Sequence, residues 1–440
     1  MIEKTKPGAR IGLPDLQGGH MDRHKQEYFI SLLKKELIPA MGCTEPIAIA
    51  YAAALGRRIL GGMPDAVEGY MSGNIVKNVK CVIVPNSGGR SGMNVAVALG
   101  LAAGDDSLEL EVISRATDAD REEMCRILEK DIIRIHLSNS VIPLDILLLL
   151  RRGGDTVTVR IADTHLNVVH LQRNDEVLIH RELDDTSLPE ISEIIMVEDV
   201  LEFARECPLD RVSDLLETQI RCNTAIAEEG LRNPWGSCVG QTMVESDSSL
   251  RTRAAAAAAA GSDARMNGCE LPVVINSGSG NQGLTVSLPL IVYARELNSP
   301  HEDLLRALLV SNLMAICQKK QIGSLSAYCG AVSAAAAAAA GLARLMGESD
   351  RVVTESYTNA LDMASGIVCD GASASCSGKI ATGIYAGMLG IDMARKRRSF
   401  NPADGIVGQT TDDTIAHVGT IARKGMKETD REILNIMLKD

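Results

Sequence analysis

The chain has 440 residues, of which 45% are hydrophobic and 2% aromatic, and its formal net charge is −12. A chain of this length and hydrophobicity can bury a large core, which excludes a disordered or fibrous protein. The acidic balance and the scarcity of aromatic platforms argue against a nucleic-acid partner. The apolar tracts at residues 141–150 and 331–342 are shorter than the ~18 residues of a membrane span, so we predict a soluble protein with no membrane partner.

The amino-terminal residues 1–22 are polar and carry no periodic apolar pattern, so they are predicted to form a flexible extension, with Met21 a candidate start. They also lack the apolar stretch of a secretory signal, and the cysteine count of 11 is odd. Both features predict a cytoplasmic protein without a complete set of disulfides. From His24 onward, apolar residues recur at helical spacing and predict an amphipathic helix that stops near Pro39.

Two stretches share one pattern, in which a strand is followed by an Asn-Ser-Gly turn and a helix. The first has a strand at residues 81–84 and a helix at 93–103, and the second has a strand at 271–275 and a helix at 284–294. The repetition suggests an internal duplication. Such a turn either brings backbone amides and a helix N-terminus to a small anion or is an ordinary connection, and the pattern leaves both open.

Between the two stretches, residues 105–185 alternate in the manner of strands and suggest a small inserted α+β unit. The two parts around it, residues 23–104 and 186–440, would then form one domain. The second part contains alanine runs at 254–260 and 334–340, which predict central helices that stop at Gly261 and Gly341. The expected fold class is therefore α+β and predominantly helical. Within the insertion we predict strands at 108–113, 156–161, 165–171 and 176–179 and a helix at 118–134.

The cysteines fall into groups according to their surroundings. Cys238 has a glycine-rich setting without a partner nearby and stays unassigned. Four others stand at glycine-rich ends of elements, namely Cys43, Cys329, Cys369 and Cys376. The remaining six lie singly within helical or strand patterns and are predicted to be small buried hydrophobes: Cys81, Cys125, Cys207, Cys222, Cys269 and Cys317.

Cys43 precedes a predicted helix that has Glu45 in its first turn, and the positive end of the helix favours a thiolate there. Thiolates gathered in a cytoplasmic enzyme indicate metal or redox chemistry, while the alternative is a set of structural thiols. Zinc sites use close Cys-x-x-Cys pairs, which this sequence lacks. An iron–sulfur cluster tolerates wider spacing, and three cysteine ligands would leave one iron open as a Lewis acid.

In its separated motifs the chain resembles the L-cysteine desulfidase family, which shares the iron–sulfur L-serine dehydratase α-chain domain and includes uncharacterised bacterial relatives. The resemblance implies an oxygen-sensitive 4Fe–4S enzyme that converts L-cysteine to sulfide, ammonia and pyruvate by non-redox β-elimination. The same chemistry on L-serine or another β-substituted amino acid is the alternative, and a non-catalytic amino-acid-binding protein with structural thiols is the alternative of another class. The resemblance runs from about residue 24 to 440 and lies in residues 42–46, 86–89, 260–266, 276–283, 328–330, 369–379, 411–415 and 425–426.

The resemblance implies that Cys329, Cys369 and Cys376 hold the cluster and that Cys43 is the base or a further ligand. Ser373 stands where the family has a lysine, which puts the substrate preference in question. A homodimer is expected. The catalytic set is completed by Glu45 and Lys379, and the substrate carboxylate would be held by the two turns through Asn86, Ser87, Gly88, Asn276, Ser277, Gly278 and Asn281.

Three further side chains have alternative roles. Lys379 is expected to be a surface or substrate-carboxylate lysine, since no phosphate-site pattern for pyridoxal phosphate accompanies it. His165 and His417 are expected to make structural hydrogen bonds.

Overall fold

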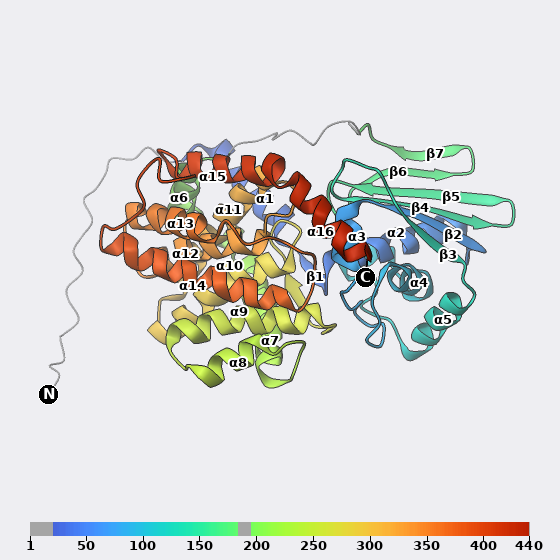
Figure 1. Ribbon diagram of the computed structural model, residues 1–440, viewed down its shortest axis with the longest axis horizontal. Helices are drawn as coiled ribbons and strands as arrows, with labels where there is room; N and C mark the ends of the chain where they lie inside the picture. Colours follow the sequence, from blue (N-terminus) through green and yellow to red (C-terminus); the bar gives the residue numbers. More distant parts are fainter. Residues whose placement is uncertain (1–20, 184–194, 440) are drawn as a thin grey trace.

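The computed structural model describes residues 21–183 and 195–439, so the predicted extension lies almost wholly outside the described residues. Figure 1 shows two lobes, one built of helices and one built around a sheet. The predicted α+β, predominantly helical fold class is confirmed. Among the described residues, no helix has both the length and the apolar character that crossing a membrane requires.

The helical lobe is assembled around α12 (Gly330–Leu345), which packs against four other helices. Those helices are α10 (Gly280–Leu297), α11 (His301–Ile322), α13 (Asp350–Ala364) and α14 (Ser375–Arg395). The lobe also contains α1 (Arg23–Glu36), α6 (Val197–Glu206), the 3-10 turn η2 (Leu209–Arg211), α7 (Ser213–Arg232), α8 (Val239–Ser246), α9 (Leu250–Met266) and α15 (Thr411–Thr420). A short antiparallel pair, β1 (Pro39–Met41) and β8 (Pro272–Val274), lies beside them.

The second lobe contains a six-stranded sheet in the order β3-β2-β4-β5-β6-β7, in which β2 and β3 are parallel and every other pair is antiparallel. Its strands are β2 (Ala66–Met71), β3 (Ile133–Leu137), β4 (Asp145–Arg152), β5 (Asp155–Ala162), β6 (Val168–Arg173) and β7 (Glu176–His180). Four helices accompany the sheet, α2 (Thr44–Leu60), α3 (Gly73–Val79), α4 (Met93–Ala103) and α5 (Asp118–Glu129), and α2 covers β4 and β5. β2 precedes residue 105 in the chain, yet it pairs with β3 and β4 in the middle of this sheet. The proposed domain boundary between residues 104 and 105 stays a prediction.

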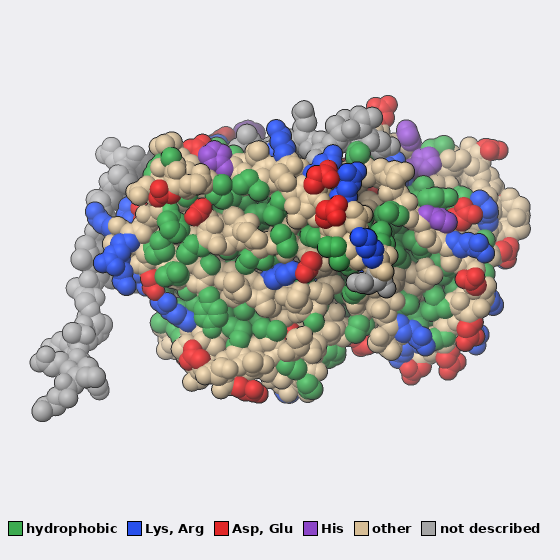
Figure 2. All heavy atoms as spheres, in the orientation of Figure 1, with side chains coloured by type: hydrophobic (Ala, Val, Ile, Leu, Met, Phe, Trp, Pro, Cys, Tyr) green, Lys and Arg blue, Asp and Glu red, His purple; other side chains and the backbone are tan. Residues whose placement is uncertain are grey.

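The chain ends in a short π-helical segment, η3 (Ile421–Gly425), followed by α16 (Lys427–Lys439). This last helix leaves the helical lobe and packs against α3, so it bridges the two lobes (Figure 1). Figure 2 shows acidic and basic side chains mixed on the face in view.

Two predicted strands are wrong. Residues 81–84 form only an isolated bridge between Ile83 and Ser91, and residues 108–113 lie mostly in the 3-10 helix η1 (Asp106–Glu111). In a strand with one solvent-exposed face, adjacent side chains alternate between buried and exposed, but Val112 and Ile113 are both buried. The carbonyl of Ile113 accepts from Asn86 Nδ2 at 2.9 Å instead of pairing with a strand. Cys81 is exposed, contrary to its predicted burial.

The alanine-rich helices also run past the glycines that were expected to end them. α9 continues to Met266 and α12 to Leu345. Gly341 serves packing, since a Cβ there would lie 2.7 Å from Leu290 Cδ2 and 2.8 Å from Ser311 Cβ. Small residues thus allow helix axes to approach closely, as composition suggested, but they do not end the helices.

Gly230 of α7 offers a direct test of this close packing. A Cβ at Gly230 would lie 2.0 Å from the carbonyl oxygen of Ala260 on α9, so Gly230→Ala must push the two helices apart. We expect a loss of about 1–3 kcal/mol in the free energy of unfolding, measured by urea denaturation. Gly378→Ala is the matched control, because that helical glycine has open space around its Cβ position and should lose no stability. Equal stabilities of the two variants would contradict the packing argument.

Candidate active site

Four helices begin at one place between the lobes, and each brings polar or sulfur groups in its first turn. The hydroxyl of Thr44 at the start of α2 donates to the carbonyl of Gly278, which leads into α10, at 2.9 Å. The start of α10 meets the start of α12, where a Cβ on Gly330 would lie 3.1 Å from Gln282 Nε2. The fourth helix, α14, contributes Cys376, which packs in one small apolar cluster with Cys43 at the N-cap of α2. Converging helix N-termini give the site a positive potential.

Two of the three predicted cluster ligands are brought together by a short backbone pairing. Tyr328 and Val368 form an antiparallel bridge, and the Cys369 amide donates to the carbonyl of Ala327 at 2.6 Å. Cys329 therefore lies beside Cys369, although 40 positions separate them in the chain. Burial, followed by the charges of Cys369 and Cys376, raises the pKa of the Cys329 thiol to about 12. We refer to these three residues and Cys43 as the thiol site.

The donor atoms of the thiol site are all sulfur, which is the donor set of an iron–sulfur cluster. Within residues 21–183 and 195–439, no three His, Cys, Asp or Glu side chains converge closely enough to hold one ion. A cluster binds each cysteine through a different iron, so its ligands need not converge on one point. The thiols are buried or half-buried, and a bound metal would hold them as thiolates although the pKa values of Cys43, Cys329 and Cys376 are raised.

Cys43 and Glu45 form a buried hydrogen-bonded pair at the start of α2. The Cys43 thiol donates to Glu45 Oε2 at 2.9 Å, and Asn78 of α3 donates to Oε1 at 3.2 Å. Burial, followed by the negative charge of Glu45, raises the pKa of Cys43 well above its ordinary value. In this arrangement Cys43 is a thiol rather than the thiolate that its helix position suggests, because burial outweighs the helix end.

The sheet lobe supplies a histidine to the same pair. His165, in the turn between β5 and β6, places Nε2 at 3.8 Å from Glu45 Oε1. Burial alone would raise the pKa of Glu45, but His165 and the Cys43 thiol lower it to about 2. His165 thus faces the site, which its sequence context did not reveal, whereas His417 makes the expected structural contact, its Nδ1 lying 2.9 Å from the carbonyl oxygen of Ile406.

Several cations surround the thiol site, and sequence patterns assigned a role to only one of them. Lys379 forms an ion pair with Asp370 at 18% side-chain exposure. Lys77 is buried, and its ammonium donates to the carbonyl of Cys369 at 3.2 Å and to Asp430 of α16 at 2.5 Å. Arg265 belongs to one of the segments that carry the family resemblance and is 2% exposed, and its charge acts on Cys43 and Cys376.

Lys319, in the last turn of α11, is the remaining cation. Burial lowers the pKa of Lys319, while the negative charges of Cys369, Glu45 and Cys329 oppose that change. The side chain thus lies within electrostatic reach of both halves of the site. The sequence offers no signal for it, since a lysine at a helix C-terminus is common.

The side chains of both Asn-Ser-Gly turns hold the turns themselves in place. Ser87 donates to the carbonyl of Arg90 at 2.9 Å, and Asn276 donates to the carbonyl of buried Asn312 at 3.1 Å. Ser277 in turn donates to Asn276 Oδ1 at 2.9 Å. Asn281 accepts from Arg265 Nη1 at 3.1 Å. The first Asn-Ser-Gly turn, residues 86–88, is next to Pro85, and Pro85 packs so closely on Gly42 that a Cβ on Gly42 would overlap it. Gly88 of this turn has a φ of 72°.

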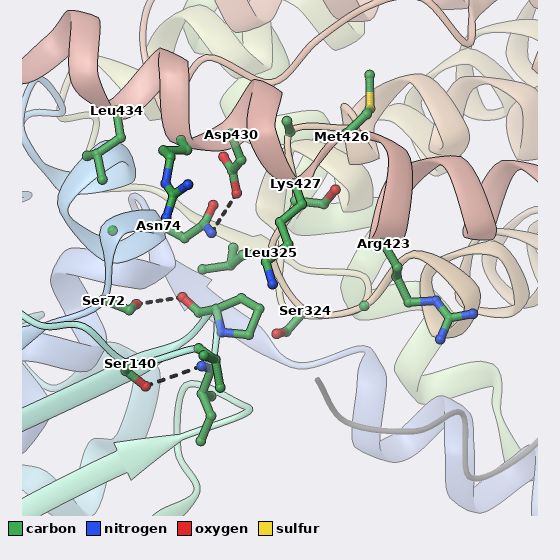
Figure 3. Close-up of a pocket in the computed structure, with 18 of the residues that line it drawn as sticks. Ser72, Asn74, Ser140, Ser324, Leu325, Arg423, Met426, Lys427, Asp430 and Leu434 are labelled. Carbon is green, nitrogen blue, oxygen red and sulfur yellow. Dashed lines mark hydrogen bonds between the residues drawn. The ribbon is translucent and has the colours of Figure 1, made fainter. Parts of the chain in front are cut away.

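Two cavities lie on either side of residues 323–324 at the junction of the lobes. The larger, about 720 Å³, is bounded by α3, α16 and the segment before Cys329, and Figure 3 shows Asn74 hydrogen-bonded to Asp430 in its wall. The smaller, about 510 Å³, has His165, Ser277, Gly278 and Lys319 in its wall. Because His165 and Gly278 also contact Glu45 and Thr44, the smaller cavity adjoins the site directly.

Comparisons with known proteins agree on one family. A family model described as serine dehydratase alpha chain matches residues 108–435. A UPF0597 protein of Finegoldia magna is 46% identical over 93% of this chain and 99% of its own length. UPF0597 proteins of Desulfitobacterium hafniense and Treponema denticola are 44% and 41% identical, over 95% and 96% of this chain and 97% and 100% of their own. The family model begins after Cys43, Glu45 and the first turn, whereas these relatives are matched over stretches long enough to include them.

The lowered pKa of Glu45 predicts a stability difference that depends on pH. Its pKa in the folded protein is about 2 against an ordinary value of 4.5, so ionised Glu45 contributes stability above pH 4.5 that is lost as the pH falls toward 2. Relative to Glu45→Gln, the free energy of unfolding of the wild type should therefore decrease by about 1 kcal/mol or more over that range. Urea denaturation of the cluster-free protein at several pH values measures it.

Glu122→Gln on the exposed face of α5 is the control and should follow the wild type at every pH. A difference between wild type and Glu45→Gln that stays constant from pH 6 to pH 3 would show that Glu45 is not held ionised by its neighbours.

Proposed function

Because the chain belongs to the serine dehydratase alpha chain family, we propose that it is an iron–sulfur-dependent β-elimination lyase that converts L-cysteine to sulfide, ammonia and pyruvate. The observation that carries the proposal is the position of Cys329, Cys369 and Cys376 beside the Cys43–Glu45 pair. A metal-ligand set and an acid–base pair at one place are the two requirements of a metal-assisted elimination. Unrelated structural thiols would not need this arrangement.

In the proposal, Cys329, Cys369 and Cys376 hold a 4Fe–4S cluster. The bound cluster, with one iron not ligated by protein, would act as a Lewis acid on the leaving sulfur or oxygen of the substrate. Lys77 fixes the backbone at Cys369, because its ammonium donates both to the carbonyl of Cys369 and to Asp430 of α16. Lys379 is held by Asp370 and adds positive charge near Cys329 and Cys376.

The proton on the substrate Cα is removed by the Cys43–Glu45 pair. Asn78 holds one oxygen of Glu45 and His165 lies 3.8 Å from it, so the other oxygen is directed at the Cys43 sulfur. Cys43 in its thiolate form would accept the Cα proton and become the thiol that donates to Glu45, which stays ionised because its pKa is lowered to about 2. Cys43 as a further cluster ligand is the alternative, and substitution of single cysteines separates the two roles.

The substrate carboxylate is placed at the Asn-Ser-Gly turns. Their side chains are used to shape the turns, so we assign the contact to backbone amides near Gly88 and Gly278. The aminoacrylate formed by elimination then tautomerises and hydrolyses to pyruvate and ammonia. All 11 cysteines are free, which supports a cytoplasmic location, and the homodimer stays a prediction.

L-serine is the second candidate substrate, and the description of the family model favours it. Ser373 is half-buried in the loop between Cys369 and Cys376, with its hydroxyl 2.9 Å from that of Ser375. A lysine expected there would bring positive charge to the leaving group, so its replacement by Ser373 is the feature of this chain that bears on substrate choice.

Two cysteine variants separate the proposed roles. Cys369→Ser should lose the cluster and all turnover, whereas Cys43→Ser should keep the iron and lose turnover by about 10²-fold or more, because only the base is removed. Iron, acid-labile sulfide and visible absorption after anaerobic reconstitution measure the cluster. Cys125→Ser on α5 is the control and should match the wild type. Iron loss in Cys43→Ser would make Cys43 a ligand, and a reconstituted wild type without iron would refute the proposal.

The products identify the substrate. Reconstituted wild-type protein given L-cysteine should release sulfide and pyruvate in equal amounts, and given L-serine it should release pyruvate at least about tenfold more slowly, which a difference of ~1.4 kcal/mol in barrier produces. Colorimetric sulfide and lactate-dehydrogenase-coupled pyruvate assays measure the two products. A higher kcat/KM for L-serine would assign the protein to serine dehydration, and no product from either, with the cluster intact, would leave the binding-protein alternative.

A further inference from the structure

We propose that the smaller cavity is the amino-acid pocket of this protein and that the ammonium of Lys319 binds the substrate carboxylate there, together with the backbone amides near Gly278. This inference rests on the proposed function and adds the residue that recognises the substrate class. Three kinds of observation carry it: the walls of the cavity, its charge and the lack of a partner for Lys319.

The cavity lies next to the proposed reacting groups. One wall is formed by Lys319 and by Gly323 and Ser324 just beyond the end of α11, and another by Ser277 and Gly278 of the second turn. His165 belongs to a third wall, and its imidazole reaches Glu45 behind it. His165 and Gly278 thus line the cavity and also contact Glu45 and Thr44 at the start of α2.

The cavity wall has a net positive charge, whereas the protein as a whole has a net negative charge. The whole chain carries −12, but basic side chains outnumber acidic ones around this cavity. Such a local excess of positive charge in an acidic protein favours an anionic ligand. The basic residues are Lys35, Arg181, Lys319 and Lys320, and the acidic ones are Glu36 and Asp163.

Among the described residues, Lys319 differs from the other lysines near the site in having no hydrogen-bond or ion-pair partner. Lys320 donates to the hydroxyl of Tyr28 at 2.9 Å. Lys379 and Lys77 form ion pairs with Asp370 and Asp430. For the ammonium of half-buried Lys319, in contrast, the described part of the chain provides neither a hydrogen bond nor a carboxylate within 4.0 Å. A partly desolvated ammonium without a counter-ion is costly, and a bound carboxylate would offset that cost.

Lys319 could instead serve the fold or the thiols. Its charge would stabilise the end of α11 through the helix dipole, or it would lower the energy of the neighbouring thiolates. The first role predicts a loss of stability in Lys319→Ala, and the second predicts a loss of iron. Carboxylate recognition predicts neither, but it does predict a loss of affinity that depends on the ligand having a carboxylate.

Calorimetric titration with unreactive ligands tests the proposal on anaerobically reconstituted protein. L-alanine has the amino and carboxylate groups but no leaving group, and L-alaninamide lacks only the carboxylate charge. We expect Lys319→Ala to bind L-alanine about tenfold or more weakly than the wild type, as loss of a hydrogen bond to a charged group implies, while the L-alaninamide affinity is unchanged. Lys319→Arg should restore most of the L-alanine affinity. Lys34→Ala, on the exposed face of α1, is the control and should bind like the wild type.

Each contrary outcome has a definite meaning. Wild-type affinity for L-alanine in Lys319→Ala, equal losses for both ligands, or a wild type that binds neither would overturn the assignment. Iron loss in Lys319→Ala, or unfolding at lower urea without a change in affinity, would assign Lys319 to the thiols or to the helix. The proposed function is tested separately by wild-type turnover, so a protein that binds L-alanine through Lys319 but releases neither pyruvate nor sulfide would refute the lyase and keep the pocket.

Discussion

The rest of the structure depends on the close approach of helices whose contact positions are occupied by glycine and alanine. A Cβ on Gly283 would lie 2.0 Å from the carbonyl of Val274, and one on Gly230 would meet Ala260 equally closely. These contacts set α10 directly against β8 and α7 against α9. Larger residues would move the helix starts apart, and with them the groups in the first turns of α2, α10, α12 and α14. The composition, poor in aromatic residues and rich in alanine and glycine, follows from this requirement.

The thiol site then combines charges that oppose one another. Burial, together with the charge of Glu45 at Cys43 and of Cys369 and Cys376 at Cys329, disfavours further negative charge and raises the pKa values of Cys43 and Cys329. Arg265 and Lys319 lie near them and act in the opposite direction. Opposing charges of this kind are expected at a site that binds a metal group and a charged substrate. Before these bind, the charges of the protein groups are incompletely balanced.

The two lobes contribute to the site together. The helical lobe provides Cys329, Cys369, Cys376 and Lys319. The sheet lobe provides Cys43 and Glu45 on α2, Asn78, which donates to Glu45, and His165, whose Nε2 lies 3.8 Å from the Glu45 carboxylate. α16 closes the arrangement, since Asp430 binds both Asn74 of the sheet lobe and Lys77 behind Cys369. The smaller cavity opens where the lobes meet, so a relative movement of the lobes would change both the cavity and the surroundings of Glu45.

The sequence by itself determined the helical character, the alanine-rich centre and the short list of cysteines at glycine-rich ends, because periodicity and glycine positions are local properties of the chain. It misjudged residues 81–84 and 108–113, where the side chain of Asn86 and tertiary burial replaced strand pairing. Only the tertiary structure decided that Cys329 lies beside Cys369 and that His165, Asn78 and Lys319 face the site. These residues are far apart in the chain and carry no local pattern, so their roles arise from burial and charge at a meeting point that only the packed helices create.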